Sequence, residues 1–288
     1  MSDKAHSVAQ RLLNFSKQQN EEYTFVLARY GAERLLYRLS LSPLGKRFML
    51  KGASLFLVWF GHAFRTTRDI DLLGEGASDL DSVANLFREL CRPDMLHLDG
   101  LVFDADSVVS QRILAAQDYE GVRVKLRATL GRSRIDLQVD IGFGDPVTPG
   151  PDTITFPVLL DAPAPILLAY PYYTAMAEKF NAMVSRDLAN SRMKDFYDLI
   201  LMFRSFNPKA EILATAIDKT FANRGTEIPR TVPLALTEGF SGDDQKRVQW
   251  NAFKKKSRLT QPMGDLSEVV LELREQFVPA LQCLGVVV

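Results

Sequence analysis

The stretch that decides the fold is "MLKGASLFLVWFGHAFRTTRDIDLLG", residues 49–74. Its pattern predicts a short strand ending at Gly52, a compact apolar helix, and a second strand that carries Asp69 and Asp71. Because side chains alternate along a strand, the two carboxylates share one face of it. A buried carboxylate without a partner is costly, so the rest of the sequence has to supply a partner for them.

The glycine turn before the helix is a candidate site for phosphate groups. A glycine that leads into a helix exposes backbone N–H groups and the positive end of the helix dipole. A Cβ at Gly52 would obstruct a phosphate there, and the hydroxyl of Ser54 is a further donor. Nearby basic residues, among them Lys51 and Arg68, are candidates to hold a polyanion.

Two neighbouring carboxylates repel one another, and a divalent cation relieves that repulsion. Mg²⁺ is usually bound by one or two carboxylates together with substrate phosphates. For the third ligand we expect Asp140 in "QVDIGFGD" first, and Asp136, of the same parity, second. Such a site performs phosphoryl or nucleotidyl transfer. In the plainer interpretation Asp69 is a cap or a partner of nearby arginines, and Asp71 is a surface strand residue.

The rest of the chain predicts an α+β protein in two parts. Helices are expected over residues 5–40 and 79–93, followed by strands from Gly121 and Arg132 joined by a tight hairpin. A proline-rich stretch from Gly144 to Pro171 is the candidate boundary. We therefore expect a domain 1–160 with a small mixed sheet and an all-helical domain 161–288. The helices expected in the second domain cover 172–185, 191–204, 208–221, 241–256 and 266–283.

Composition restricts the class of protein. The 288 residues contain 35 Lys and Arg against 35 Asp and Glu, so the net charge gives no argument for nucleic-acid binding. Two distant cysteines and three isolated histidines make a zinc site improbable. No signal peptide is visible and no apolar run is long enough to span a bilayer, which predicts a cytoplasmic protein without membrane partners.

The helical half contains two motifs that place a charge beside an apolar stripe. Lys179 borders such a stripe, where a lysine often only extends its head group to solvent. In "SRMKDFYDLILMF", Asp195 belongs to a charged cluster on the first turns of a helix, which ordinary i, i+3 and i+4 ion pairs would explain. The alternative is that Asp195 orients Lys179 or Arg192 at a cleft between the two parts. Asp198 is expected to be structural.

The blocks "LKGASLFLVW…RTTRDIDLL", "QVDIGFGD" and "AEKFNAMV…NSRMKDFYDL" together resemble the AbiEii/MenT group of polymerase-β-like nucleotidyltransferases. These are nucleotidyltransferase-type toxins of bacterial toxin–antitoxin and phage-abortive systems. The resemblance implies a set of metal-binding acids, Asp69, Asp71 and Asp140. It further implies that Gly52 and Ser54 form the phosphate turn, that Lys179 touches the triphosphate, and that Asp195 is needed for activity.

The same resemblance implies an activity. A nucleotidyltransferase of this group uses Mg²⁺, or Mn²⁺ in its place, to transfer NMP from an NTP to an acceptor hydroxyl. The expected acceptor is the 3′ end of a tRNA, which would inhibit translation, and the expected protein partner is a cognate antitoxin. A protein-modifying (AMPylating) enzyme and a catalytically inactive nucleotide-binding module are the alternatives. The basic run Lys254–Arg258 is either a solvated helix face or a contact for an RNA backbone.

Overall fold

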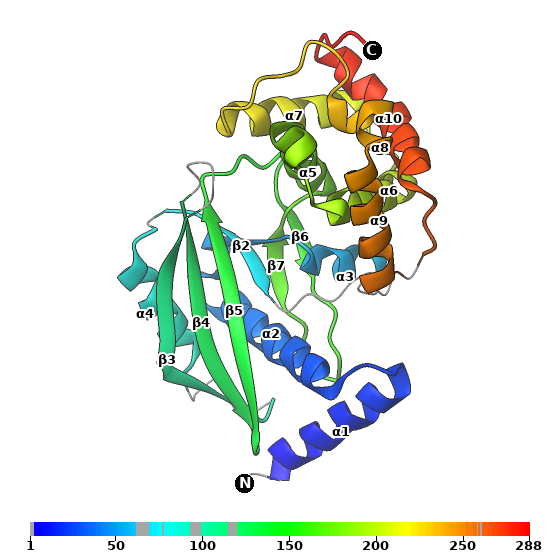
Figure 1. Cartoon of the computed structure of the whole chain (residues 1–288). Helices are drawn as coiled ribbons and strands as arrows, with labels where there is room; N and C mark the ends of the chain where they lie inside the picture. The colour runs from blue at the N-terminus through cyan, green and yellow to red at the C-terminus, as the bar shows by residue number, and fades with distance from the viewer. Residues whose placement is uncertain are drawn as a thin grey trace. The chain divides into compact units, whose positions relative to one another are not determined.

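The computed structural model describes residues 3–61, 69–76, 78–92, 99–114, 120–257, 259 and 261–288. The predicted α+β class is confirmed: within these residues the chain forms a seven-stranded mixed sheet and a set of helices (Figure 1). The chain divides into two compact units. The first contains most of the chain up to Gly144 together with Asp152–Ala169, and the second contains Asp145–Pro151 and Tyr170–Val288. Each unit is described by itself.

The first unit is built around the sheet, whose strand order is β3-β4-β5-β2-β1-β7-β6. The pairs β2·β5 and β1·β7 are parallel and the remaining neighbours are antiparallel. Its strands are β1 (Phe48–Lys51), β2 (Ile70–Gly74), β3 (Leu101–Leu114), β4 (Glu120–Leu130), β5 (Ser133–Phe143), β6 (Asp152–Thr155) and β7 (Ile166–Ala169). Its helices are α1 (Asp3–Gln19), α2 (Tyr23–Leu41), a 3₁₀ turn at Gly45–Arg47, α3 (Ser54–Phe60) and α4 (Leu80–Leu90).

Along β4 and β5 the sheet has one apolar and one polar face, because buried and more exposed side chains alternate in these two strands. Val122 and Val124 of β4 and Val139 and Ile141 of β5 are at most 1 % exposed. Helices α2 and α4 pack against this sheet (Figure 1), and burial of each such side chain contributes about 1.5–3 kcal/mol. The residues between them in sequence are polar and partly exposed, so the opposite face carries the charged side chains.

Three strands were not predicted from the sequence. Strand β3 was overlooked, and the proline-rich stretch taken as a boundary contains β6 and β7. Strand β7 pairs with β1 through Met49–Leu168 and Leu50–Ala169, so it belongs to the sheet of the first unit. Strands of four residues are too short to show a period against neighbouring prolines. The division into domains 1–160 and 161–288 stays a prediction.

A buried ion pair lies under the sheet on α2. Glu33 and Arg34 are each 1 % exposed, and Arg34 Nη2 lies 2.8 Å from Glu33 Oε1. The backbone N–H of Leu159 donates to Glu33 Oε2 at 2.7 Å. Burial raises the pKa of Glu33 to about 7, since Arg34 and the Leu159 N–H offset the desolvation only in part.

The raised pKa of Glu33 gives a prediction about stability. A carboxyl whose folded pKa exceeds its ordinary value, 4.5, stabilises the fold below pH 4.5 and loses that contribution as the pH rises through about 7. We expect the free energy of unfolding to fall across this interval, and Glu33→Gln to remove that dependence. Urea unfolding at several pH values measures it. Glu22→Gln, at an exposed position just before the same helix, is the control and should keep the wild-type slope.

The second unit is helical in its described residues, as predicted. Its helices are α5 (Tyr172–Arg186), α6 (Met193–Phe206), α7 (Ala210–Asn223), α8 (Glu238–Ser241), α9 (Asp244–Lys256) and α10 (Leu266–Cys283), with 3₁₀ turns at Asp187–Ala189 and Leu234–Leu236. Phe180 stacks on Phe277 with ring centroids 4.3 Å apart and forms part of the core. Trp250 is 1 % exposed, and its Nε1 donates to the Gly264 carbonyl, so it belongs to the same core. Among the described helices, none has the length and apolar character needed to cross a membrane.

Candidate active site

A row of charged residues crosses the polar face of the sheet at one level. Lys51 of β1 is the register partner of Asp71 of β2. Asp71 is in turn the partner of Asp140 of β5, and Asp140 the partner of Arg123 of β4. Register partners point to the same face and neighbouring strands lie about 4.8 Å apart. The row therefore has two adjacent carboxylates at its centre and a cation at each end.

The two central carboxylates repel one another, and the structure shows what offsets this at one end. Arg123 donates from Nε to Asp140 Oδ1 and from Nη2 to Asp140 Oδ2, both at 2.7 Å. The pKa of Arg123 is raised, chiefly by these hydrogen bonds and also by the charges of Asp140, Asp69 and Asp71. The negative charges of all three predicted acids therefore act on the Arg123 guanidinium.

The donor set fits a hard divalent cation, which prefers carboxylate oxygens. Within the part of the chain that the structure describes, however, no group of three acids, histidines or cysteines is placed to hold a metal ion. Both oxygens of Asp140 accept from Arg123 instead. Coordination of one ion by Asp69, Asp71 and Asp140 stays a prediction. Asp136, the second choice, pairs instead with Arg134 at 2.9 Å on the exposed surface.

The turn at Gly52 lies directly against Asp71. Gly52 has φ +73°, and an ideal Cβ there would come within 2.0 Å of Asp71 Oδ2. A glycine is required both by the backbone conformation and by this close approach. Helix α3 then begins at Ser54, as the sequence predicted. The binding of phosphate by Gly52 and Ser54 stays a prediction.

This geometry predicts a specific effect of Gly52→Ala. We expect a loss of activity and of stability, because the methyl group would displace the Asp71 carboxylate in addition to the backbone strain of about 1–2 kcal/mol. Gly61→Ala is a matched control, since Gly61 has φ +74° and no atom of the described residues lies within 4 Å of its ideal Cβ. Differential scanning calorimetry and initial rates compare the two. Equal effects of both substitutions would contradict the proposed contact with Asp71.

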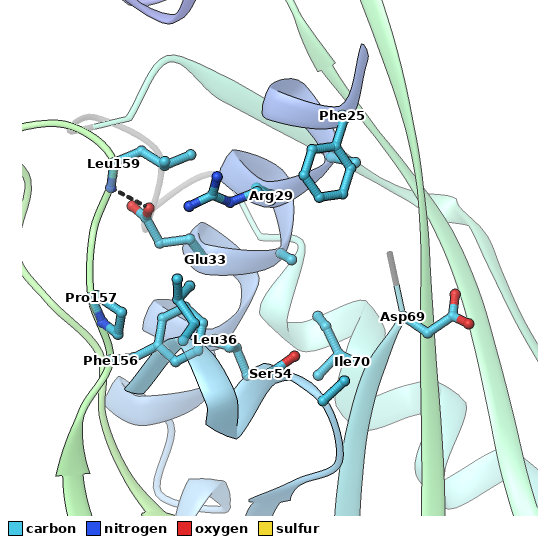
Figure 2. Close-up of a pocket in the computed structure, with 14 residues that line it drawn as sticks. Phe25, Arg29, Glu33, Leu36, Ser54, Asp69, Ile70, Phe156, Pro157 and Leu159 are labelled. Carbon is cyan, nitrogen blue, oxygen red and sulfur yellow. Dashed lines mark hydrogen bonds between the residues drawn. The ribbon is translucent and has the colours of Figure 1, made fainter. Parts of the chain in front are cut away.

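A pocket of the first unit adjoins the same turn. Figure 2 shows it between α2, the start of α3 and the segment Phe156–Leu159, with Ser54 and Asp69 among its lining residues. Most of the lining is apolar, and the small side chains of Ala28 and Ala32 on α2 leave the space open. The carboxylate of Asp69 points away from the apolar wall at Phe156. The pocket thus places an apolar hollow next to two predicted site residues.

The second unit contains a buried charge cluster around Lys179. Lys179 Nζ donates to Asp195 Oδ1 at 3.1 Å and to Asp198 Oδ2 at 2.6 Å. Arg192 Nε donates to Asp195 Oδ2 at 2.5 Å. Both aspartates are at most 1 % exposed, and the Lys179 side chain is 17 % exposed. Burial raises the pKa of Asp195, but the charges of Lys179 and Arg192 outweigh it and bring the value to about 2.

The structure thus groups the predicted residues in two places. Asp71, Asp140, Lys51 and Gly52 meet on the first unit, and Lys179 contacts Asp195 on the second. Arg68 lies outside the described residues. The cleft expected between the two parts, and contact of Lys179 with a triphosphate, stay predictions.

The sequence does not predict two of these side-chain pairings. Asp198, which is expected to be structural, shares the Lys179 ammonium with Asp195; the i, i+3 spacing on one helix is the available signal. Arg123 is not singled out by the sequence, because its pairing with Asp140 depends on the register of β4 and β5. In the basic run near the end of α9, Lys254 donates to the Gly264 carbonyl at 3.0 Å, and Arg258 lies outside the described residues.

The mixed sheet carries two paired acids beside a glycine turn and a short helix, as the resemblance to nucleotidyltransferases implied. Residues 34–275 match the family described as "Nucleotidyl transferase AbiEii toxin, Type IV TA system". The chain belongs to this family of nucleotidyltransferase toxins of toxin–antitoxin systems.

A solved structure shows the same fold at low sequence identity. The crystal structure of JHP933 from Helicobacter pylori is similar, with a TM-score of 0.50 and 15 % identity over 94 % of this chain and 91 % of that one. A second H. pylori structure, of a protein proposed to be a nucleotidyltransferase, has a TM-score of 0.47 and 15 % identity over 98 % of this chain and 96 % of that one. No curated protein matches the sequence.

Proposed function

We propose that this protein is a Mg²⁺-dependent toxin that transfers NMP from an NTP to an acceptor hydroxyl, with the 3′ end of a tRNA as the acceptor. The observation that carries the proposal is the alignment of Asp71 and Asp140 at one register beside the Gly52 turn. Membership in the AbiEii family supports the same class of reaction. A cognate antitoxin is the proposed protein partner.

The residues of the first unit have distinct roles in this proposal. Asp69, Asp71 and Asp140 hold Mg²⁺, or Mn²⁺ in its place, and the metal supplies charge stabilisation for the triphosphate and the attacking oxygen. Gly52 and Ser54, with Lys51 and Arg68, bind the phosphates. The pocket beside Ser54 and Asp69 has the apolar lining that suits the nucleoside.

In this proposal the charge cluster of the second unit orients Lys179 to bind an anion. Asp195 and Asp198 accept hydrogen bonds from its ammonium and fix its direction. In the proposed reaction the acceptor oxygen forms a bond to the α-phosphorus as the bond to the β-phosphate oxygen breaks. Pyrophosphate leaves, and the hydroxyl proton is released. Lys179 would stabilise the negative charge of the triphosphate during this step.

The test is a transfer assay with Mg²⁺, labelled NTPs, and either total tRNA or total protein. Label on tRNA, followed by sequencing of RNA 3′ ends after induction in cells, supports the proposal and shows which NTP is used. Label on protein would establish an AMPylating enzyme instead. NTP binding without pyrophosphate release would indicate a nucleotide-binding module. Chelation of divalent cations with EDTA should stop transfer.

A further inference from the structure

We propose that Arg123 is a built-in competitor of the catalytic cation, one that occupies the Asp140 carboxylate until an ion displaces it. This inference rests on the proposed function in one respect, namely that Asp71 and Asp140 are metal ligands. It adds that the metal site is closed in the ion-free protein and that Arg123 sets its affinity.

The geometry of the pair supports competition rather than a passive surface contact. Both Asp140 oxygens accept from one guanidinium at 2.7 Å, and such bidentate pairs are among the stronger hydrogen-bonded ion pairs. The two side chains are 31 % and 22 % exposed, so solvent screens the pair only in part. An ion that takes the lone pairs facing Arg123 has to displace the guanidinium from Asp140.

The position of the Arg123–Asp140 pair in the charged row explains why the ion-free protein needs a cation there. Without a cation, Asp71 and Asp140 face each other at one register, and like charges directly opposite destabilise a sheet. Arg123 supplies positive charge at the Asp140 end of this pair. In the ion-free protein the guanidinium therefore offsets the repulsion between Asp71 and Asp140, as a bound divalent ion would in the metal-loaded protein.

The next arginine along the same face provides a contrast. Arg127 of β4 has the same parity as Arg123 but lies 3.6 Å from Asp104, with both side chains about 45 % exposed. Its charge is the same, yet it does not contact Asp140 in the register of β4 and β5, where its partner is Asp136. Arg127→Gln therefore removes a positive charge from this face without opening the proposed metal site.

Metal binding to the whole protein tests the inference without any need for turnover. Titration with Mn²⁺, followed by electron paramagnetic resonance, should show tighter binding to Arg123→Gln than to the wild type by about tenfold, since the ion no longer displaces a bound cation. Arg123→Lys keeps the charge but cannot bridge both oxygens, and should also bind Mn²⁺ more tightly, by a smaller factor. Arg127→Gln should bind as the wild type does.

The ion-free stability provides a second readout. Arg123→Gln should lower the melting temperature in EDTA. Saturating Mn²⁺ should raise it by more than it raises that of the wild type, because stabilisation by a bound ligand grows with the logarithm of the ratio of its concentration to its Kd. Unchanged or weaker Mn²⁺ binding by Arg123→Gln would overturn the inference. Wild-type Mn²⁺ affinity in Arg123→Lys would also overturn it, because the tighter binding by Arg123→Gln would then result from the change in net charge alone. Absence of Mn²⁺ binding in every variant would also overturn it.

The result is separable from the proposed function. Tighter Mn²⁺ binding in Arg123→Gln together with no label transfer to any acceptor would support the competitor and reject the nucleotidyltransferase. Transfer activity together with unchanged Mn²⁺ affinity in Arg123→Gln would support the nucleotidyltransferase and reject the competitor.

Discussion

Replacing Asp71 with asparagine is expected to lower the rate of nucleotidyl transfer by a factor of about 10³ or more, because a lost metal ligand removes several kcal/mol of charge stabilisation. Asp71 occupies the centre of the charged row, between Lys51 and Asp140, and lies against the Gly52 turn. Initial rates of pyrophosphate release measure the effect. The fold should not suffer, since the substitution removes one of two opposed carboxylates, so the melting temperature should stay level or rise.

The matched control is Asp136→Asn. Asp136 lies on the same strand as Asp140 with the same parity, but it pairs with Arg134 on the exposed surface. Exposed pairs contribute about 0–1 kcal/mol, and this substitution should leave the rate within about twofold of the wild type. A rate near the wild-type value for Asp71→Asn, or an equal loss in Asp136→Asn, would reject the assignment of the acids.

Replacing Lys179 with methionine is expected to destabilise the protein by about 3–5 kcal/mol, since it leaves buried negative charge without its main partner. Asp195 and Asp198 both accept from Lys179 Nζ, and Arg192 contacts only Asp195. Urea unfolding monitored by circular dichroism measures the loss. If Lys179 also contacts the triphosphate, the rate of transfer should fall by more than the unfolded fraction explains.

Two further measurements distinguish the loss of this charge cluster from a general loss of stability. Lys179→Met combined with Asp198→Asn should recover part of the lost stability, because the second substitution removes the charge of one of the two carboxylates that lose Lys179. In the wild type, Asp195 has a pKa lowered to about 2, so its stabilising contribution is present above its ordinary value and is lost as the pH falls toward 2. The double variant should lack part of this acid dependence. Stability within 1 kcal/mol of the wild type for Lys179→Met would contradict the buried cluster.

The sequence alone determined the local parts of the first unit. The order of strand, glycine turn, helix and strand in residues 49–74 follows from short-range patterns, and the structure has it as β1, α3 and β2. Parity placed Asp71 on the polar face of β2, and the short connection between β4 and β5 indicated their hairpin. The main helices of the second unit followed from apolar stripes that repeat every three to four residues.

Only the tertiary structure decided which charges meet. Asp71 and Asp140 are partners because β2 and β5 pair in parallel, and Arg123 reaches Asp140 because β4 pairs with β5 in one particular register. A shift of one residue would send each side chain to the other face. Likewise, Asp198 shares Lys179 because α5 and α6 pack together. Local patterns specify which face a residue takes along its own element, whereas pairing across elements depends on the packing of segments far apart in the sequence, which no local pattern records.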